Sequence, residues 1–267
     1  MINIVEYETG IILFMRRRQY SMIPYVRREK LLEIVSQKEI IYIPQLLELF
    51  EDTSESTLRR DLKMLSDAGY ITLLHGGAAK LKPGSTVDLP IDDKLTLHQD
   101  KKEKIASYAA SLVHEGDVIF MDASTTVLPM INDLKGKKIT IVTASASLLS
   151  MINDENITCI VLGGELVMKT GSIVGSMTEN QLSSMFFDKA FVGANGFSQQ
   201  GGVNTPDYRE ASKKQLVRQN SKEMYLLMDS SKAEVTTFCR VFDLHECAII
   251  TDAYHELLEN FLSYTVV

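Results

Sequence analysis

Three consecutive hydroxyl residues are candidates for binding an anion. Ser124, Thr125 and Thr126 follow Asp122 just after a short apolar stretch that ends at Met121. Hydroxyls and free backbone N–H groups at the start of a helix bind phosphate without needing a lysine. One hydroxyl would satisfy an ordinary helix cap, so three in succession favour phosphate binding. The sequence contains neither the P-loop nor the dinucleotide-binding glycine motif, which disfavours a nucleotide enzyme.

A second set of residues suits contact with nucleic acid. Ser56, Arg59, Arg60 and Lys63 recur at i, i+3, i+4 and i+7, which places them on one face of a helix. Arginine can fork onto guanine edges or phosphates, and short hydroxyls reach backbone oxygens. A solvated charged face is the ordinary alternative for an isolated helix, so the neighbouring segments decide between the two.

The segments around this face predict a small helical module with a hairpin. Three helical patterns carry apolar stripes and are too short to be stable alone, so we expect them to pack on one another. Ser54 suits the N-cap of the third helix. The segment 71–74, followed by His75-Gly76-Gly77, predicts a wing hairpin. The stripes are Leu31, Ile34 and Val35; Leu46, Leu47 and Phe50; and Leu58, Leu62 and Leu65.

The charge is distributed unevenly along the chain. The 267 residues carry a net charge of −7, which taken alone disfavours nucleic acid. Residues 1–80 hold 11 basic and 11 acidic side chains, whereas residues 81–267 hold 17 and 24, so the deficit lies wholly in the second part. A neutral module whose cations share one face is compatible with binding DNA.

The composition narrows the protein class further. Three cysteines without a C-x-x-C pair disfavour a disulfide framework and a zinc site, and they favour a cytoplasmic protein. We expect no metal and no cofactor. The apolar run 11–15 is far too short to span a membrane. Glu6 and Glu8 precede that run and three arginines follow it, the reverse of a signal peptide.

The chain divides at a breaker-rich segment around Pro83, Gly84 and Pro90. We assign 1–24 to an N-terminal extension, 25–80 to the helical module, 81–93 to a linker and 94–267 to a larger domain. The extension fits neither domain. We hypothesise that Met22 is the natural start, with Met1 as the alternative.

The larger domain has the pattern of a mostly parallel sheet covered by helices. Short apolar runs alternate with helical stretches, and such strands are buried on both faces. One helix before the first strand is expected to bury Ile105, Tyr108, Ala109 and Leu112. The predicted strands are 118–121, 139–142, 158–162, 190–192, 225–228 and 248–250.

Polar or glycine residues follow nearly every predicted strand. Ligands in such sheets bind beyond the carboxyl ends of the strands, so we expect a pocket there. Glu210 and Lys213 are further candidates, although at i, i+3 they can simply pair with each other. Lys232 is another. The strand-end residues are Asp122, Thr143, Gly163, Gly164, Gly193 to Gly196, Asp229 and Asp252.

The helical module resembles the winged helix-turn-helix of DeoR-family bacterial transcriptional regulators. The matching strings are Ser56-Thr57-Leu58-Arg59-Arg60-Asp61-Leu62 and His75-Gly76-Gly77-Ala78, within about 25–80, and the helix-turn-helix proper would be 42–61. The resemblance implies binding to double-stranded operator DNA. The candidate DNA contacts are Ser54, Ser56, Thr57, Arg59, Arg60, Lys63 and His75.

The larger domain resembles the effector domain of the same family across 94–252. The matching strings are 123–126, 162–164, 191–196, 207–210 and 229–232. That domain is similar to ribose-phosphate isomerases, and family members respond to phosphorylated sugars. The resemblance implies that Ser124, Thr125 and Thr126 hold the phosphate and that Asn195, Glu210, Lys213 and Lys232 face the sugar. Ala123 and Ala144 depart from the family pattern, which leaves the identity of the sugar open.

The sequence therefore indicates a transcriptional regulator, most simply a repressor of a carbohydrate-utilisation operon that acts as a homodimer or homotetramer. The alternative is a sugar-phosphate isomerase with a DNA-binding appendage, in which Glu210 would be the base. Asn195 offers an amide where the related isomerases place an acidic residue, and this disfavours catalysis. A DNA-binding structural protein without a ligand would leave the hydroxyl run unexplained.

Overall fold

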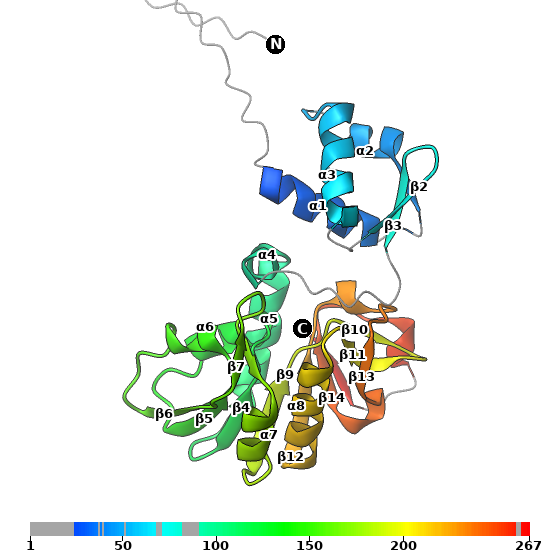
Figure 1. Ribbon diagram of the computed structural model, residues 1–267. Coiled ribbons are helices and arrows are strands. Elements are labelled where there is room, and N and C mark those ends of the chain that lie inside the picture. The colour runs from blue at the N-terminus through cyan, green and yellow to red at the C-terminus, as the bar shows by residue number, and fades with distance from the viewer. Residues whose placement is uncertain are drawn as a thin grey trace, which may run out of the picture. The chain divides into compact units, whose positions relative to one another are not determined.

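The computed structural model describes residues 24–36, 38, 40–50, 52–67, 71–81, 91–259 and 263–267. The chain forms two compact units, Met1–Leu81 and Lys82–Val267 (Figure 1). The extension before Pro24, with the hypothesis that Met22 is the start, lies outside the described residues. So does most of the predicted linker, but Leu81 belongs to a strand and Ile91 begins a helix, so regular structure enters that segment at both ends.

The N-terminal unit is built from three helices and a small sheet. The helices are α1 (Pro24–Ser36), α2 (Ile43–Leu49) and α3 (Glu55–Asp67). The strands β1 (Ile41–Tyr42), β2 (Ile71–Leu74) and β3 (Ala78–Leu81) pair antiparallel in the order β1-β3-β2. The predicted apolar stripes are confirmed, because seven of the nine residues are buried in one core and the other two, Ile34 and Leu47, pack against it.

The predicted wing hairpin is β2 and β3. Its turn consists of His75, Gly76 and Gly77, and both glycines have positive φ angles, of 84° and 78°. Residues with a side chain rarely adopt that backbone conformation, so the two glycines allow the turn to have this shape. The Gly77 carbonyl accepts a hydrogen bond from the N–H of Ile43 at 3.1 Å, which ties the wing to the start of α2.

The predicted parallel sheet is confirmed in the C-terminal unit, where it has seven strands, one more than predicted. The strand order is β15-β14-β12-β9-β4-β5-β6, and each neighbouring pair is parallel. All six predicted strands occur, with ends shifted by up to a few residues. The strands are β4 (Val118–Met121), β5 (Ile139–Thr143), β6 (Ile157–Val161), β9 (Phe187–Val192), β12 (Ser221–Leu227), β14 (Ala248–Thr251) and β15 (Tyr264–Val266).

Helices cover both faces of this sheet (Figure 1). One core contains residues of α7 (Ser176–Leu182) and α8 (Tyr208–Gln219), and the other contains residues of α5 (Gln99–Ser111) and the 3-10 helix η1 (Leu128–Asn132). The remaining helical segments are α4 (Ile91–Thr96), α6 (Ala146–Leu149), η2 (Ser230–Lys232), η3 (Leu244–Glu246) and η4 (Glu256–Leu258). No helix among the described residues is long and apolar enough to cross a membrane.

Two small sheets were not predicted. A hairpin joins β7 (Glu165–Val167) to β8 (Ser172–Val174), and β10 (Gly196–Ser198), β11 (Gly202–Thr205) and β13 (Cys239–Phe242) form a three-stranded antiparallel sheet. These strands have three or four residues each and contain polar residues or glycine, so they lack the continuous apolar runs that predicted strands such as β4.

Two local predictions are wrong. Tyr108 is 37% exposed, and the buried face of α5 consists of Lys102, Ile105, Ala106, Ala109 and Ala110. Tyrosine is amphipathic, so it satisfied the apolar pattern without being buried. The hydroxyl run was expected to start an ordinary helix, but residues 125–127 form a turn that leads into the 3-10 helix η1.

Candidate functional site

The outward face of α3 presents the predicted DNA contacts to solvent. Ser56, Arg59, Arg60 and Lys63 are exposed, while Leu58 and Leu62 on the opposite face are buried. Among the described residues, Arg60 and Lys63 have no ion-pair partner. Two cations on one helix face therefore stay available for an anionic partner.

Arg59 is held in place at the same face. Its Nε and Nη2 donate to Oε1 of Glu55 at 2.9 and 2.6 Å. A Cβ at Gly77 would lie 3.2 Å from Nη1 of Arg59, so the guanidinium also rests against the wing turn. An exposed i, i+4 pair contributes only ~0.3–0.5 kcal/mol, so a phosphate can replace Glu55 as the partner of Arg59.

The start of α3 gathers the predicted hydroxyls. The Oγ of Ser54 accepts a hydrogen bond from the Thr57 N–H at 3.3 Å, which is the predicted N-cap contact. It also lies 2.8 Å from Oγ1 of Thr57 and 3.0 Å from Oγ of Ser56. His75 is exposed in the wing turn. The structure thus places hydroxyl groups at the positive end of the helix dipole.

Asp61 fixes α3 from its inner side. This carboxylate is 2% exposed and accepts from Nε of Arg27 at 2.5 Å, with Nη1 of Arg28 at 3.6 Å. The buried ion pair joins α1 to α3, so these two arginines serve the fold, unlike Arg60. Sequence reasoning gave Asp61 no role because the pairing is 34 residues distant in the chain.

In the C-terminal unit, the hydroxyl loop 122–127 connects β4 to η1. Oγ of Ser124 accepts from the Thr126 N–H at 3.2 Å, and the Ser124 carbonyl accepts from the N–H groups of Val127 and Leu128 at 2.9 Å each. Those amides are therefore occupied. The N–H groups of Ser124 and Thr125 donate to no described residue, and the hydroxyls of Thr125 and Thr126 bond to none.

Gly193, at the end of β9, is required by the hydroxyl loop. A Cβ at this position would lie 2.0 Å from Oγ and 2.4 Å from Cβ of Ser124. Non-bonded atoms cannot approach each other that closely, so only a glycine at position 193 allows Ser124 to pack onto the end of β9. Two residues that lie 69 positions apart in the sequence are thereby in direct contact.

Asp122 lies beneath the loop in a buried charge cluster. It is 2% exposed, and its Oδ2 lies 3.1 Å from Nζ of Lys214 and accepts from the Gly193 N–H at 3.3 Å. Its Oδ1 lies 3.8 Å from Nζ of Lys213 and accepts no hydrogen bond from any residue in the described part of the chain. Burial would raise the pKa of Asp122, but Lys214 and Lys213 together hold it below the ordinary range of an aspartate.

Glu210 and Lys213 on α8 do pair with each other. Nζ of Lys213 is 3.0 Å from the Glu210 carboxylate, and it also donates to Oγ of Ser172 at 2.6 Å. Lys213 is fully buried, whereas the Glu210 side chain retains 13% exposure. Lys213 therefore links α8 to the β7–β8 hairpin, and Glu210 is the member of the pair nearer to solvent.

Lys214 is a member of this buried charge cluster that the sequence analysis did not identify. It is 5% exposed, and its Nζ donates to the Gly193 carbonyl at 2.8 Å and lies near Asp122. Its position between Ala211 and Val217 on the buried face of α8 was a usable signal, because a lysine on an apolar face needs a buried partner.

A second charged cluster lies at the ends of β12 and β14. Burial would raise the pKa of Asp229, but Lys232, the Ser231 hydroxyl, His98 and Lys102 lower it overall. Asp252 accepts from the Ser230 N–H at 2.6 Å and pairs with Lys101 at 2.9 Å. The sequence analysis did not identify Lys101 and Lys102 as members of this cluster. Both lie in the first turn of α5.

The other candidate residues are already engaged in the fold. Thr143 is fully buried, donates to the Met121 carbonyl at 2.7 Å and accepts from the Ser145 N–H. Oδ1 of Asn195 accepts from Thr205 at 3.2 Å. A Cβ at Gly164 would lie 2.1 Å from Oγ1 of Thr178, so this glycine allows α7 to approach.

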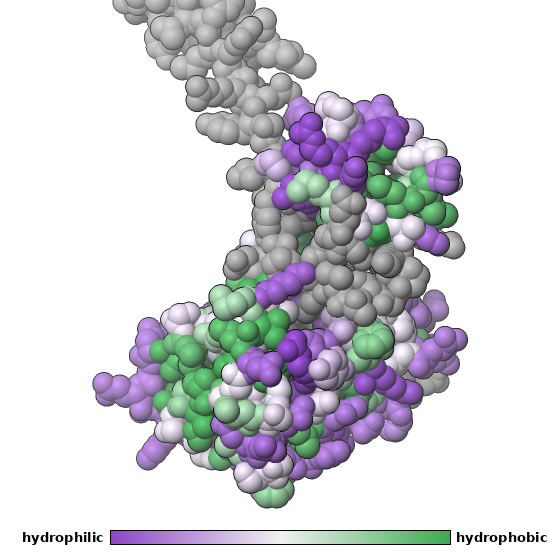
Figure 2. All heavy atoms as spheres, viewed as in Figure 1, coloured by the Kyte–Doolittle hydropathy of each residue, from purple (hydrophilic) through white to green (hydrophobic). Residues whose placement is uncertain are grey.

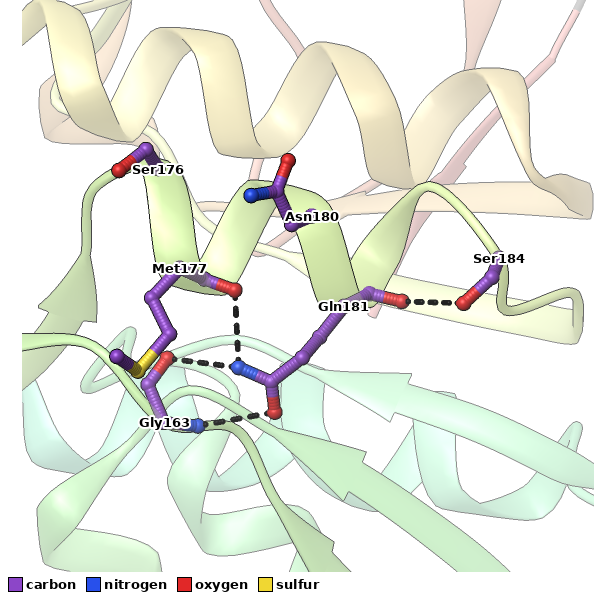
Figure 3. A pocket seen from close by; sticks show the side chains of 6 residues that line it. All are labelled: Gly163, Ser176, Met177, Asn180, Gln181 and Ser184. Carbon is purple, nitrogen blue, oxygen red and sulfur yellow. Dashed lines mark hydrogen bonds between the residues drawn. The ribbon is translucent and has the colours of Figure 1, made fainter.

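A surface hollow lies along α7. It is lined by Gly163, Ser176, Met177, Asn180, Gln181 and Ser184, of which only Gly163 was a candidate (Figure 3). The Gln181 carboxamide bridges the N–H and carbonyl of Gly163 and the carbonyl of Met177. These hydrogen bonds hold the Gln181 side chain in place along the wall of the hollow. The described residues contain no cluster of metal ligands.

Comparisons with known proteins account for both units. Residues 27–83 match the family described as a DeoR-like helix-turn-helix domain, and residues 97–253 match the DeoR C terminal sensor domain. The chain is 36% identical over 245 residues to an uncharacterized HTH-type transcriptional regulator FruR of Bacillus subtilis (strain 168), covering 90% of this chain and 96% of the relative. It is 35% identical over 248 residues, with the same coverages, to a lactose phosphotransferase system repressor of Lactococcus lactis subsp. lactis.

Similar solved structures include ribose 5-phosphate isomerase A from Methanocaldococcus jannaschii. It is 20% identical, with a TM-score of 0.37, over 51% of this chain and 54% of the isomerase.

Proposed function

The chain belongs to the DeoR family of transcriptional regulators, and from this premise we propose which residues read its operator and sense its effector. It is a DNA-binding transcriptional regulator. The proposed DNA surface is the exposed face of α3 with the wing turn. The observation that carries this proposal is the pair Arg60 and Lys63, exposed and without an ion-pair partner among the described residues. The other proposed contacts are Ser54, Ser56, Thr57, Arg59 and His75.

The proposed effector is a phosphorylated sugar bound at the carboxyl ends of the strands. The unbonded hydroxyls of Thr125 and Thr126 and the unbonded N–H groups of the loop would receive the phosphate. The unpartnered Oδ1 of Asp122 supports a polar ligand above it, because a buried carboxylate oxygen is normally hydrogen-bonded. The proposed site also includes Ser124, Thr143, Gly163, Gly164, Asn195, Glu210, Lys213 and Lys232.

Regulation follows from a difference in affinity. A sugar phosphate that binds the DNA-incompetent arrangement more tightly shifts the population toward it by that differential affinity. We propose a cytoplasmic repressor of a carbohydrate-utilisation operon, because a relative is named a lactose phosphotransferase system repressor. Paired recognition helices at half-sites one helical turn apart require a homodimer or a homotetramer.

The effector proposal is tested by thermal unfolding with a panel of sugar phosphates. A ligand that binds only the native state raises its stability, so at least one aldose or ketose phosphate is expected to raise the Tm. Lys232→Ala should abolish that shift while leaving operator binding in a gel-shift assay unchanged. The Glu103→Ala variant, on the exposed side of α5, serves as a control. Absence of a shift with every phosphorylated sugar would contradict the proposal.

We further propose that the protein does not catalyse isomerisation. Glu210, the potential base, is paired with Lys213, and Asn195 supplies an amide that cannot exchange a proton as a carboxylate does. Purified protein incubated with aldose phosphates should form no ketose phosphate above the rate without protein. Turnover that Glu210→Gln abolishes would overturn this proposal.

A further inference from the structure

The edge strand β6 has the composition of an interface rather than of a protected edge. It ends the strand order of the sheet, so no strand in the described part of the chain pairs with its outer side. Its sequence, Ile-Thr-Cys-Ile-Val, has no charged residue and no proline. Natural proteins blunt exposed edges with charges, proline or bulges, because an open edge pairs with other chains.

Apolar side chains surround the same edge. Ile160 is 41% exposed and Val161 is 36% exposed, and neighbouring residues of a strand point to opposite faces of the sheet. Leu149 of α6, Leu166 of β7 and Met168 just beyond it are also exposed. Figure 2 shows hydrophobic residues gathered over the part of the C-terminal unit where Figure 1 places β6, α6 and β7. Both faces of the edge therefore favour burial.

The outward backbone groups of β6 match those of a second, antiparallel β6 strand. The Leu162 N–H donates to Thr143 of β5, so the alternate residues 157, 159 and 161 point their backbone groups outward. The Ile157 N–H donates to the Asp154 carbonyl. Within the described part of the chain, the outward N–H groups of Cys159 and Val161 and the three outward carbonyls are therefore without a partner. In an antiparallel pair centred on Cys159, each Val161 N–H would meet the Ile157 carbonyl of the second copy, and the two Cys159 residues would exchange bonds.

We infer that β6 pairs antiparallel with β6 of a second copy of this chain, joining two seven-stranded sheets into one. A second copy is the occupant that the edge fits, because two-fold pairing matches each free donor to a free acceptor and brings no like charges together. The inference deepens the proposed function, on which the need for an oligomer rests.

The opposite edge of the sheet provides a matched control. Strand β15 has three residues to the five of β6, so it offers fewer free backbone groups. Val266 on β15 is 45% exposed, close to the 41% of Ile160. A lysine at either position adds the same charge to an edge strand, and only the one on β6 would lie in the proposed interface.

Sedimentation equilibrium of the full-length protein tests the inference without DNA or sugar. We expect Ile160→Lys to have half the wild-type mass and Val266→Lys to retain it. Thr158→Lys, at an exposed position on the same face as Ile160, should reproduce the halving, and circular dichroism checks that each variant is folded. A wild-type monomer, an unchanged mass of both β6 variants, or a halving caused by Val266→Lys would overturn the inference.

Operator binding separates this inference from the proposed function. Ile160→Lys should bind operator DNA at least tenfold more weakly than Val266→Lys, because single helix-turn-helix units lose the second half-site. If the mass halves but no form of the protein binds DNA, the proposed function fails and the interface stands. If the mass of the β6 variants is unchanged and DNA binds normally, only the interface fails.

Discussion

Arg60 on α3 and Lys214 on α8 are both cationic residues on helices, but Arg60 is exposed to solvent and Lys214 is buried. Arg60 is exposed and has no ion-pair partner among the described residues, whereas Lys214 is 5% exposed and lies against Asp122 and the Gly193 carbonyl. Leaving a solvated charge without an ion-pair partner costs little free energy, so the side chain remains available to bind a phosphate. A charge removed from water must be paired, so its partners determine the local structure. The same contrast separates residues that can bind DNA from residues that shape a ligand site.

Loss of the buried cation should have the largest effect. Lys214→Met leaves the Asp122 carboxylate buried with one partner fewer, and we expect the free energy of unfolding of the C-terminal unit to fall by about 3–5 kcal/mol. Urea denaturation measures this. Lys63→Met removes an exposed cation and should change stability by less than about 0.5 kcal/mol. Equal effects of the two variants would break the contrast.

The double variant Asp122→Asn with Lys214→Met sharpens the same test. Removing both charges should restore most of the stability, because no unpaired ion remains buried. A double variant as unstable as Lys214→Met alone would show that packing of the lysine side chain, rather than its charge, stabilises the unit.

An intermediate effect is expected at the contact between the hydroxyl loop and β9. Gly193→Ala places a Cβ against Ser124, and overpacking of this kind typically costs about 1–3 kcal/mol. The variant should also lose any Tm shift caused by sugar phosphates. Adding Ser124→Gly removes the clashing side chain and should restore stability but not ligand binding. Recovery of both would mean that Ser124 does not contact the ligand.

The smallest predicted effect concerns the exposed pair on α3. Glu55→Ala frees Arg59 and removes a negative charge beside the proposed DNA surface, so operator affinity should rise about threefold, in line with the ~0.2–1 kcal/mol of an exposed pair. Fluorescence anisotropy with labelled operator measures the change. Glu48→Ala, an exposed acidic residue on α2, should have less effect. A greater gain from Glu48→Ala would place the DNA on α2.

Periodicity made much of this molecule predictable. The stripe of Leu58, Leu62 and Leu65 identified α3 and hence the face that carries Arg60, and apolar runs such as 118–121 identified the sheet. In both cases a repeat along the chain directly reflects burial on one side.

What could not be predicted depends on contacts distant in the chain. The burial of Lys214 depends on Asp122, which lies 92 positions earlier, and the close approach of Gly193 to Ser124 depends on two strand ends that meet only in the folded sheet. The hydroxyl loop follows β4 as predicted, but it continues as the 3-10 helix η1, and the Ser124 carbonyl accepts from the N–H groups of Val127 and Leu128.

The central claim is that unpaired cations on α3 bind DNA while the buried ones do not. The direct test is operator affinity of Arg60→Ala, measured by anisotropy at a fixed salt concentration together with its Tm. We expect binding to weaken about tenfold or more, since a specific arginine contact is worth about 1–3 kcal/mol, with the Tm unchanged. Arg240→Ala, an exposed arginine of the C-terminal unit, should bind as the wild type does. Wild-type affinity of Arg60→Ala would contradict the account.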